Sequence, residues 1–498
     1  MSLFYKPDDG WAADCIPFYW RGEYHLFYLK DYRDKAAHGE GTPWFHLGTR
    51  DFVTFSEYGE ALPRGTRDAQ DLYVFTGCVV ERDGAFHIFY TGHNPHLRAQ
   101  GKPEQAVMHA VSDDLHIWRK IPEDTFFAPH GPHDLYEPHD WRDPFVFWNA
   151  EAGEYWMLLA ARLKEGPSNR RGCTALCASS DLQRWEIRAP FWTPGLYYTH
   201  ECPDLFRMGD WWYLVFSEFS STCVTRYRMA TSLRGPWLAS RNDTFDGRAF
   251  YAAKTASDGE RRFVFGWNPT RVEERNDRSW QWGGNVVVHE VAQRRDGSLI
   301  VHAPDGVNRA FHTKMPLTVT SRLGNCVITA TSITLDEPAS FAYADAGPLP
   351  DACRIAARVS FDESTHGCGL MLRVSDDLEA GYYIRLEPSR NRLVFDSWPR
   401  AGDIPFMVEL ERPLDVDLRE PVEIVALVDG TVCEVYIAGT SAMSARLYDL
   451  PQGTWGTESP DEGAIAASLV GVGHRTRGLW GVFVIEGKAT FDQISLLA

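Results

Sequence analysis

Three carboxylic acids, Asp14, Asp143 and Glu201, occupy related places in the sequence, each eight to ten residues before a glycine that begins an aromatic-rich segment. Grouped carboxyl groups can do acid–base chemistry because burial and like-charge repulsion separate their pKa values. One carboxyl then stays protonated as a general acid while another stays ionised as a nucleophile. Cleavage of a glycosidic bond needs this pair of roles.

Each acid also has an ordinary structural interpretation. The run Trp141-Arg142-Asp143-Pro144 is compatible with a turn salt bridge, and Asp14 and Glu201 are compatible with strand caps. Their related positions favour a shared role, and we predict all three as catalytic residues. The matched positions in two other copies of the repeat hold Thr76 and Tyr251.

The glycines begin copies of one aromatic strand motif within the first 270 residues. The copies start at Gly22, Gly84, Gly153, Gly209 and, more weakly, Gly259, at intervals of 62, 69, 56 and 50 residues. Short strands, turn residues and a repeat of about 50 to 60 residues are typical of a β-propeller with four-stranded blades, so we predict five blades. We find no long 3.6-residue periodicity between the copies, which argues against βαβ units and a parallel sheet.

The repeat separates two groups of acids. The innermost strand of each blade lines the central channel of a propeller, so we expect Asp14, Asp143 and Glu201 to converge there. Other acids lie in a polar turn, closed by an aromatic residue, that follows most copies. Because Asp bonds its own backbone in turns, we predict turn formers rather than catalysts at Asp51, Asp114 and Asp181.

After about residue 310 the repeat stops and alternating strands follow. The clearest signal is Asp429-Gly430 between two alternating runs at 422–428 and 431–437, which predicts a tight β-hairpin. Seven or so antiparallel strands favour a β-sandwich. We therefore predict an all-β chain with a propeller domain at 1–310 and a sandwich domain at 330–498. The further strands that we expect are Arg354 to Phe361, Gly369 to Val374, Tyr382 to Glu387, Arg392 to Asp396 and Gly478 to Ile485.

Composition limits the partners of the chain. Its 498 residues include 68 Asp plus Glu against 50 Lys plus Arg, a formal charge of −18, and this field repels nucleic acid and anionic membrane surfaces. No signal-peptide pattern opens the chain, and ten scattered cysteines suit reduced thiols, so we expect a cytoplasmic protein without a structural disulfide. The predicted sandwich is large enough to support a homo-oligomer or to bind glycan.

Cofactor chemistry receives little support from the sequence. His130, His133 and His139 cluster in a Pro-rich loop, but their spacing differs from the paired-histidine helix of zinc enzymes. Cys173 and Cys177 form a single pair that alternate strand positions explain. A phosphate-binding glycine loop, a serine nucleophile elbow and a redox Cys-x-x-Cys motif are all lacking from the sequence. We therefore expect neither a metal ion nor a cofactor.

Several of these motifs together resemble glycoside hydrolase family 32, which contains invertases, inulinases, levanases and other β-fructofuranosidases. Trp141-Arg142-Asp143-Pro144 and Glu201-Cys202-Pro203-Asp204-Leu205-Phe206 resemble the paired signature of the family. Phe75-Thr76-Gly77, the segment 249–255 and Phe265-Gly266-Trp267 resemble three further family segments, and the resemblance extends across nearly the whole chain. It implies a five-bladed propeller joined to a β-sandwich.

The resemblance also assigns roles. Asp14 would be the nucleophile, Asp143 would bind sugar hydroxyls and stabilise the transition state, and Glu201 would be the general acid and base. Family members retain configuration through a covalent glycosyl-enzyme, which requires the nucleophile and the acid/base to lie about 5 to 5.5 Å apart, whereas inversion needs about 6.5 to 9.5 Å.

The first motif departs from the family pattern. The family reads Trp-Met-Asn-Asp-Pro-Asn-Gly where this chain reads Trp11-Ala12-Ala13-Asp14-Cys15-Ile16-Pro17, and a family glutamine is replaced by Leu29. Both asparagines are therefore absent. Because amides would hydrogen-bond the sugar, the resemblance transfers the chemistry better than it transfers the substrate.

We therefore hypothesise a retaining hydrolase of β-fructofuranosides, of the sucrose, fructo-oligosaccharide or fructan type. Two alternatives remain. The same fold could transfer the glycosyl unit or act on another furanoside such as an arabinofuranoside, or the chain could be a sugar-binding propeller without turnover. The predicted substrate-binding residues, each of which could instead pack within a blade, are Trp11, Trp44, Phe75, Thr76, Arg142, Tyr251 and Trp282.

Overall fold

The computed structural model describes residues 3–129, 135–398, 410–450 and 478–498. The chain divides into two compact units. The propeller unit consists of Phe4–Asn268 and Gly283–Leu299, and the sandwich unit consists of Met1–Leu3, Pro269–Trp282 and Ile300–Ala498. Neither unit is one continuous stretch of chain, so the division is more interleaved than a single boundary after residue 310.

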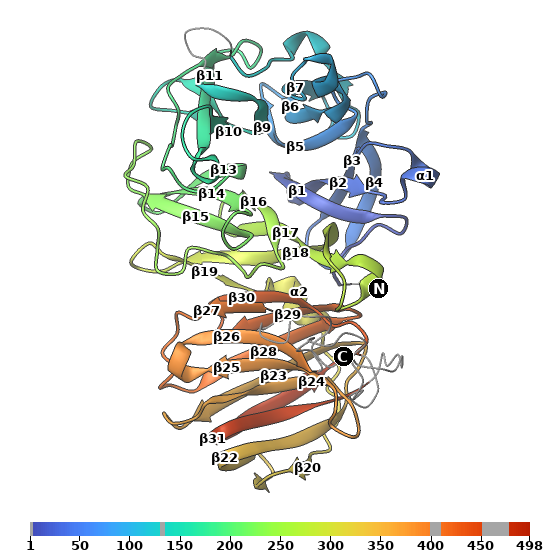
Figure 1. Ribbon diagram of the computed structural model, residues 1–498, viewed down its shortest axis with the longest axis vertical. Coiled ribbons are helices and arrows are strands. Elements are labelled where there is room, and N and C mark those ends of the chain that lie inside the picture. The colour runs from blue at the N-terminus through green and yellow to red at the C-terminus, as the bar shows by residue number, and fades with distance from the viewer. Residues whose placement is uncertain (1–2, 130–134, 399–409, 451–477) are drawn as a thin grey trace, which may run out of the picture. The chain divides into compact units, whose positions relative to one another are not determined.

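The propeller unit is built from antiparallel groups of strands that follow one another along the chain (Figure 1). The first blade contains β1 (Trp11–Trp20), β2 (Glu23–Asp31), β3 (Trp44–Thr49) and β4 (Phe55–Leu62). The second contains β5 (Tyr73–Arg82), β6 (Ala85–His93), β7 (Gln105–Ser112) and β8 (Arg119–Lys120). The third contains β9 (Tyr136–Asn149), β10 (Glu154–Leu163), β11 (Gly172–Ser179) and β12 (Glu186–Ile187).

Two more groups follow. The fourth blade contains β13 (Glu201–Met208), β14 (Trp211–Glu218) and β15 (Val224–Ala230), and the fifth contains β16 (Tyr251–Ser257), β17 (Arg262–Arg271), β18 (Trp280–Gln293) and β19 (Leu299–His302). The first strands, β1, β5, β9, β13 and β16, contact one another in turn, and β16 also contacts β1. These contacts close a ring of five blades, as the repeat predicts.

Each repeat glycine lies at the same place in its blade. Gly22, Gly84, Gly153, Gly209 and Gly259 all have φ between +57° and +98° in the tight turn between the first and second strands of a blade. Only glycine adopts this backbone conformation without steric cost. The aromatic strand that follows each glycine is therefore the second strand of the blade, and the hydrophobic core of the unit lies between such strands of neighbouring blades.

The turn-forming acids also lie where the sequence predicts them. The backbone N–H groups of Val53 and Thr54 donate to Asp51 Oδ1. Those of His116 and Ile117 donate to Asp114 in the same way, and those of Gln183 and Arg184 donate to Asp181. Helices in this unit are short: α1 (Lys35–His38), η1 (Pro95–Gln100), η2 (Pro122–Asp124) and η3 (Ser168–Arg170).

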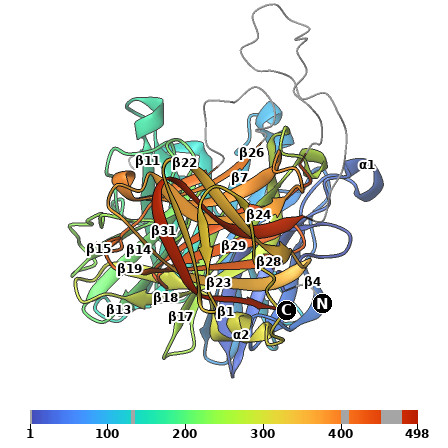
Figure 2. The ribbon, with the colours of Figure 1, turned by 90° about the horizontal axis from the view of Figure 1, so that it is seen from below.

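The strands of the sandwich unit form one antiparallel sheet. Two sets of strands, called arms below, are joined through a single strand. Both arms attach to β31 (Leu479–Leu497), whose residues 479–485 pair with β24 and whose residues 489–497 pair with β23. Figure 2 shows β31 curving past both arms. The other strands are β20 (Thr320–Leu323), β21 (Cys326–Ile328), β22 (Ser332–Pro348), β23 (Ala352–Phe361), β24 (Gly367–Val374), β25 (Gly381–Glu387), β26 (Arg392–Trp398), β27 (Leu410–Pro413), β28 (Val422–Asp429), β29 (Val432–Ile437) and β30 (Ser441–Arg446).

The strands predicted for this unit are present within two residues of the expected bounds, except that β31 extends twelve residues beyond the predicted end at Ile485. The Asp429-Gly430 hairpin joins β28 to β29, with Asp429 paired to Val432. Two short helices, α2 (Asp305–Ala310) and η5 (Pro388–Arg390), lie between strands, and η4 (Val272–Glu274) lies between β17 and β18.

All ten cysteines lie within the described residues as free thiols. In the described ranges, the chain has no helix with the length and apolar character needed to cross a bilayer.

Candidate active site

The first strand of every blade carries an irregularity at the same level of the ring. The strand register shifts at Asp14 in β1, at Thr76 in β5, at Asp143 in β9, at Cys202 in β13 and at Ala252 in β16. Such a β-bulge adds one residue to one strand and re-aims the side chains around it. Four of these residues, all except Thr76, have φ between +24° and +57°.

The positions of the bulges correct the prediction that the three acids hold the same strand position, which was based on their distance from the repeat glycines. Asp14 and Asp143 occupy the bulge itself, whereas Glu201 lies one residue before it, at the position that Arg142 and Tyr251 hold in the adjacent blades. The turns between β9 and β10 and between β16 and β17 have four residues each, against two in the other blades, so a fixed number of residues before the glycine does not mark the same strand position in every blade. The structure nevertheless brings the three acids together, because Arg142 contacts both Asp143 and Glu201, and Cys202 contacts both Asp143 and Asp14.

Asp14 is held by groups from two other blades. Trp267 Nε1 donates to Asp14 Oδ1 at 3.0 Å, and the Thr76 hydroxyl donates to Oδ2. Burial raises the pKa of Asp14 to about 7; the two hydrogen bonds oppose this shift, and the neighbouring charge of Asp143 increases it. Asp14 is therefore oriented by fixed donors at a site that resists its ionisation.

Asp143 is the most enclosed of the three acids, with 5% of its side chain exposed. Its Oδ2 accepts a hydrogen bond from the backbone N–H of Cys202 at 3.0 Å, and Arg142 Nε lies 3.7 Å from the same oxygen. Burial raises the pKa of Asp143 to about 6, while Arg142 counteracts that effect and Glu201 adds to it. Its own backbone N–H donates to Thr91 Oγ1 at 2.7 Å, which fixes the bulge.

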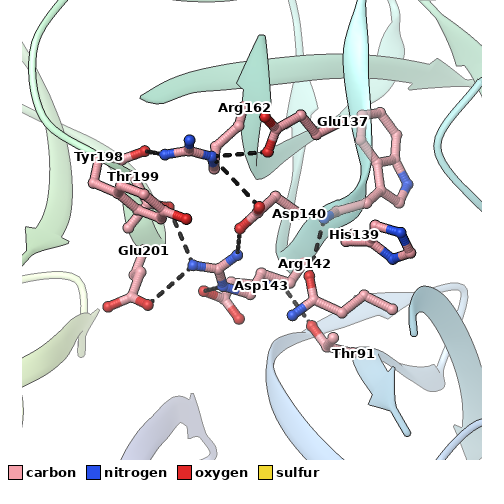
Figure 3. Close-up of polar contacts among 12 residues, drawn as sticks. Thr91, Glu137, His139, Asp140, Arg142, Asp143, Arg162, Tyr198, Thr199 and Glu201 are labelled. Atoms are coloured by element: carbon pink, nitrogen blue, oxygen red, sulfur yellow. Dashed lines mark hydrogen bonds and ion pairs between the residues drawn. The ribbon is translucent and has the colours of Figure 1, made fainter. Parts of the chain in front are cut away.

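Glu201 lies between a cation and a phenol, as Figure 3 shows in part. Arg142 Nη2 is 3.0 Å from Glu201 Oε1, and the Tyr251 hydroxyl donates to Oε2 at 2.7 Å. With 21% of its side chain exposed, Glu201 is more open to solvent than Asp143. The carboxyl group is thus oriented on both oxygens while it stays accessible, which suits a group that exchanges protons.

The predicted substrate-binding residues divide by environment. Arg142, Thr76 and Tyr251 contact the acids directly, so each can orient a carboxyl group as well as a ligand. Phe75 is half-buried and stacks on His93 with ring centroids 4.8 Å apart. Trp11 is half-buried, with the cationic groups of Lys6 and Arg33 at 4.5 and 4.3 Å from its ring.

The structure corrects the assignment of Trp44 as a pocket wall. Its indole is fully buried, its Nε1 donates to the backbone carbonyl of Val74 at 3.1 Å, and its ring packs on Phe27 and Tyr90. This leaves no surface for a ligand. Trp282 belongs to the sandwich unit and is 37% exposed, and its role stays a prediction.

The residues that replace the amide side chains of the family pattern form an apolar layer. Ala13, Ile16 and Leu29 are all at most 1% exposed and share one core cluster with Trp267. Two residues that contact the acids or their neighbours were not among the residues predicted from the sequence. Trp267 had a signal in the Phe265-Gly266-Trp267 run of the fifth repeat, whereas Arg162, which Figure 3 shows beside Asp140, had none.

The residues near the acids give no sign of a metal centre. The side chains of Asp14, Asp143 and Glu201 are contacted by Arg142 and by neutral donors. His130 and His133 lie outside the described residues, and His139 Nδ1 is 3.8 Å from Glu104.

A closed five-bladed ring with three carboxyl groups on its inner strands, in a chain that also contains a β-sandwich unit, defines the class of β-propeller glycoside hydrolases. The model of the glycosyl hydrolases family 32 N-terminal domain matches residues 4–303. The chain therefore belongs to glycosyl hydrolase family 32.

Relatives and solved structures agree with this assignment. The chain is 25% identical over 341 residues to a sucrose-6-phosphate hydrolase of Escherichia coli, covering 64% of this chain and 67% of the relative. It is 23% identical to a levanbiose-producing levanase of Bacillus subtilis (strain 168), covering 95% and 90%. Fructan 1-exohydrolase IIa of Cichorium intybus has the same fold, with a TM-score of 0.69, 15% identity and coverage of 99% of this chain and 96% of that one.

Proposed function

We propose that this chain hydrolyses β-fructofuranosides with retention of configuration, through a covalent glycosyl-enzyme. The observation that carries the proposal is the contrast between Asp14 and Glu201. Asp14 is fixed by two neutral donors, Trp267 and Thr76, whereas Glu201 is bonded by a cation, Arg142, and by the Tyr251 hydroxyl. Two carboxyl groups in different environments take different roles.

In the proposed first step, Asp14 attacks the anomeric carbon while Glu201 gives its proton to the leaving oxygen. This forms the bond between Asp14 and the sugar and breaks the glycosidic bond. In the second step, Glu201 takes a proton from water, and the water oxygen displaces Asp14 from the anomeric carbon. Asp143 stays ionised against the Cys202 N–H and Arg142, where it can accept hydrogen bonds from sugar hydroxyls.

The relatives support a fructosyl substrate. Their names include sucrose-6-phosphate hydrolases and levanases, and one solved neighbour is a fructan 1-exohydrolase in complex with 1-kestose. The apolar residues Ala13, Ile16 and Leu29 favour a second candidate, transfer to another sugar or action on a different furanoside, because they offer no amide to the ligand.

The test is product analysis after incubation with sucrose, inulin, levan and a panel of aryl furanosides. Release of free fructose supports hydrolysis, a new oligosaccharide supports transfer, and release from only an arabinofuranoside supports the second substrate. Asp14→Ala and Glu201→Ala should each lower kcat at least a thousand-fold without loss of the fold. Binding without any product from the panel would refute the enzyme, and retained activity in either variant would refute its assigned role.

A further inference from the structure

A fully buried arginine of the third blade, Arg162 in β10, holds the strand that carries two of the site residues. Its neighbours Ala161 and Leu163 pair with Trp141 and Tyr136 of β9, so the four residues 137–140 bulge out opposite Arg162 alone. Only 1% of the Arg162 side chain is exposed. A buried guanidinium is costly unless all its donors are satisfied, and this bulge supplies the acceptors.

The Arg162 guanidinium joins three segments of the propeller unit. Its Nε lies 3.0 Å from Glu137 Oε2 and 3.5 Å from Asp140 Oδ2, both in the β9 bulge. Its Nη1 donates to the carbonyl oxygens of Ser168, at 3.1 Å, and Tyr198, at 2.5 Å. The guanidinium carbon also lies 3.4 Å from the centre of the Tyr198 ring.

Two routes lead from Arg162 to Glu201 (Figure 3). In the first, Asp140 Oδ1 pairs with Arg142 Nη1 at 2.6 Å, and Arg142 Nη2 reaches Glu201 at 3.0 Å. In the second, Arg162 fixes the carbonyl of Tyr198, and the next residue, Thr199, accepts a hydrogen bond from Arg142 Nη2 at 3.2 Å. Both routes end on the contact between Arg142 and Glu201.

Arg142 has a competing partner, which makes the anchor necessary. Asp143 is its chain neighbour and already lies 3.7 Å from its Nε. A free guanidinium would turn to bind this carboxylate with two hydrogen bonds, because that fork geometry is the strongest available to arginine. Asp140 prevents the turn by occupying Nη1, and Arg162 keeps Asp140 in place.

We propose that Arg162 and Asp140 are positioning residues that hold Arg142 against Glu201 and thereby fix the orientation of the acid/base carboxyl group in the reaction. The proposal rests on the role proposed above for Glu201. Neither residue touches the reacting atoms. Without the anchor, Arg142 no longer holds Glu201 Oε1, so the carboxyl group loses the orientation that proton transfer to a poor leaving group requires.

The test compares Arg162→Met with wild type on an alkyl and an aryl β-fructofuranoside. An alkyl leaving oxygen needs the Glu201 proton, whereas a nitrophenolate leaves without it. We expect kcat for the alkyl substrate to fall 10- to 100-fold with KM within a factor of two, and kcat/KM for the aryl substrate to change less than three-fold. Arg162→Lys keeps the positive charge but not the several fixed donors of the guanidinium, and should show the same changes as Arg162→Met.

The matched control is Arg262→Met. Arg262 donates to Thr255 Oγ1 and lies over the Phe206 ring, outside the contacts that join Asp140, Arg142 and Glu201. We expect Arg262→Met to lower the rates on the alkyl and the aryl substrate by the same factor, or to leave both rates unchanged. If Arg162→Met does not fold by circular dichroism, Asp140→Asn serves instead and should show the same selective loss for the alkyl substrate.

An unchanged ratio of alkyl to aryl rates in a folded Arg162→Met or Asp140→Asn variant would overturn the positioning role. Failure of the proposed function looks different. In that case wild type has no activity, or Glu201→Ala keeps its activity and gains nothing from added azide, which replaces a missing acid/base as an external nucleophile.

Discussion

Asp14 is a carboxyl group whose proposed role requires a charge that its surroundings oppose. Burial raises its pKa to about 7, against 3.8 for the free side chain. The folded protein thus binds the Asp14 proton more tightly than the unfolded chain does. This contribution to stability is fully present below about pH 3.8 and is lost as the pH rises through 7.

Asp14→Asn should therefore stabilise the fold while it abolishes turnover. We expect the gain in the free energy of unfolding to be larger at pH 8 than at pH 5, by roughly 2 kcal/mol, since a shift of one pKa unit is worth about 1.4 kcal/mol and Asp14 keeps some contact with solvent. Urea unfolding at the two pH values measures this. Asp114→Asn is the matched control, because hydrogen bonds from Ile117 and His116 lower the pKa of Asp114, so its loss should destabilise. An equal gain at both pH values contradicts the electrostatic explanation.

Asp143 should shift the pH dependence of the reaction through its effect on Asp14. Because the nucleophile must be ionised, we expect kcat/KM to rise with pH through about 7. Asp143→Asn removes a negative charge that raises the pKa of Asp14, so the rising limb should move to lower pH while the maximum falls roughly 100-fold or more. Rates across pH 4 to 9 measure both effects. A limb that stays in place would show that Asp143 does not act on the nucleophile.

At the scale of the strand, the bulge of β5 depends on a residue without a side chain. A Cβ atom on Gly77 would overlap the carbonyl oxygen of Phe89 and lie 2.7 Å from Tyr90 Cα, both on the neighbouring strand β6. Gly77 follows Thr76, whose hydroxyl orients Asp14. The tight approach of β5 to β6 therefore helps to place the proposed nucleophile.

Gly77→Ala should push the two strands apart. We expect a loss of about 3 kcal/mol or more in the free energy of unfolding, together with a loss of activity that exceeds the unfolded fraction. Gly84→Ala is the control, since Gly84 has φ +85° but open space around a Cβ, and should cost about 1 kcal/mol with normal activity. Urea unfolding and kcat measure the pair. Equal costs for the two variants would contradict the close-packing argument.

The strands also show what sequence could predict and what it could not. The repeat glycines identified the blades because a tight turn with positive φ leaves a direct mark on residue type. The bulges left no such mark, since Asp14, Cys202 and Ala252 adopt the same conformation with unrelated side chains. Arg162 stayed invisible for a similar reason: its acceptors at Ser168 and Tyr198 are backbone carbonyls, which every residue has.

At the scale of the whole chain, the division into two units cuts through the strands β17 and β18. Strand β17 begins in the propeller unit and β18 ends there. The segment Pro269–Trp282, which includes the end of β17 and the start of β18, belongs to the sandwich unit. Within that unit, Arg271 N donates to the Tyr448 hydroxyl at 2.9 Å, Arg446 Nε donates to the Pro269 carbonyl at 3.0 Å, and Asn276 Nδ2 donates to the Tyr382 hydroxyl at 2.6 Å. Residues of the C-terminal half thus bond the segment Pro269–Trp282 within the sandwich unit.

A chain cut after residue 310 should therefore fail to behave as an independent domain. The cut leaves the buried Arg271 backbone and the Pro269 carbonyl without their partners, and each lost partner of a buried polar group costs about 1 to 3 kcal/mol. We expect residues 1–310 to aggregate or to melt well below the full chain, and β17, which carries Trp267, to lose its hold on Asp14. Thermal unfolding, size-exclusion chromatography and kcat on an aryl β-fructofuranoside measure this. A soluble fragment with the kcat of the full chain would show instead that the hairpin closes the fifth blade without the second unit.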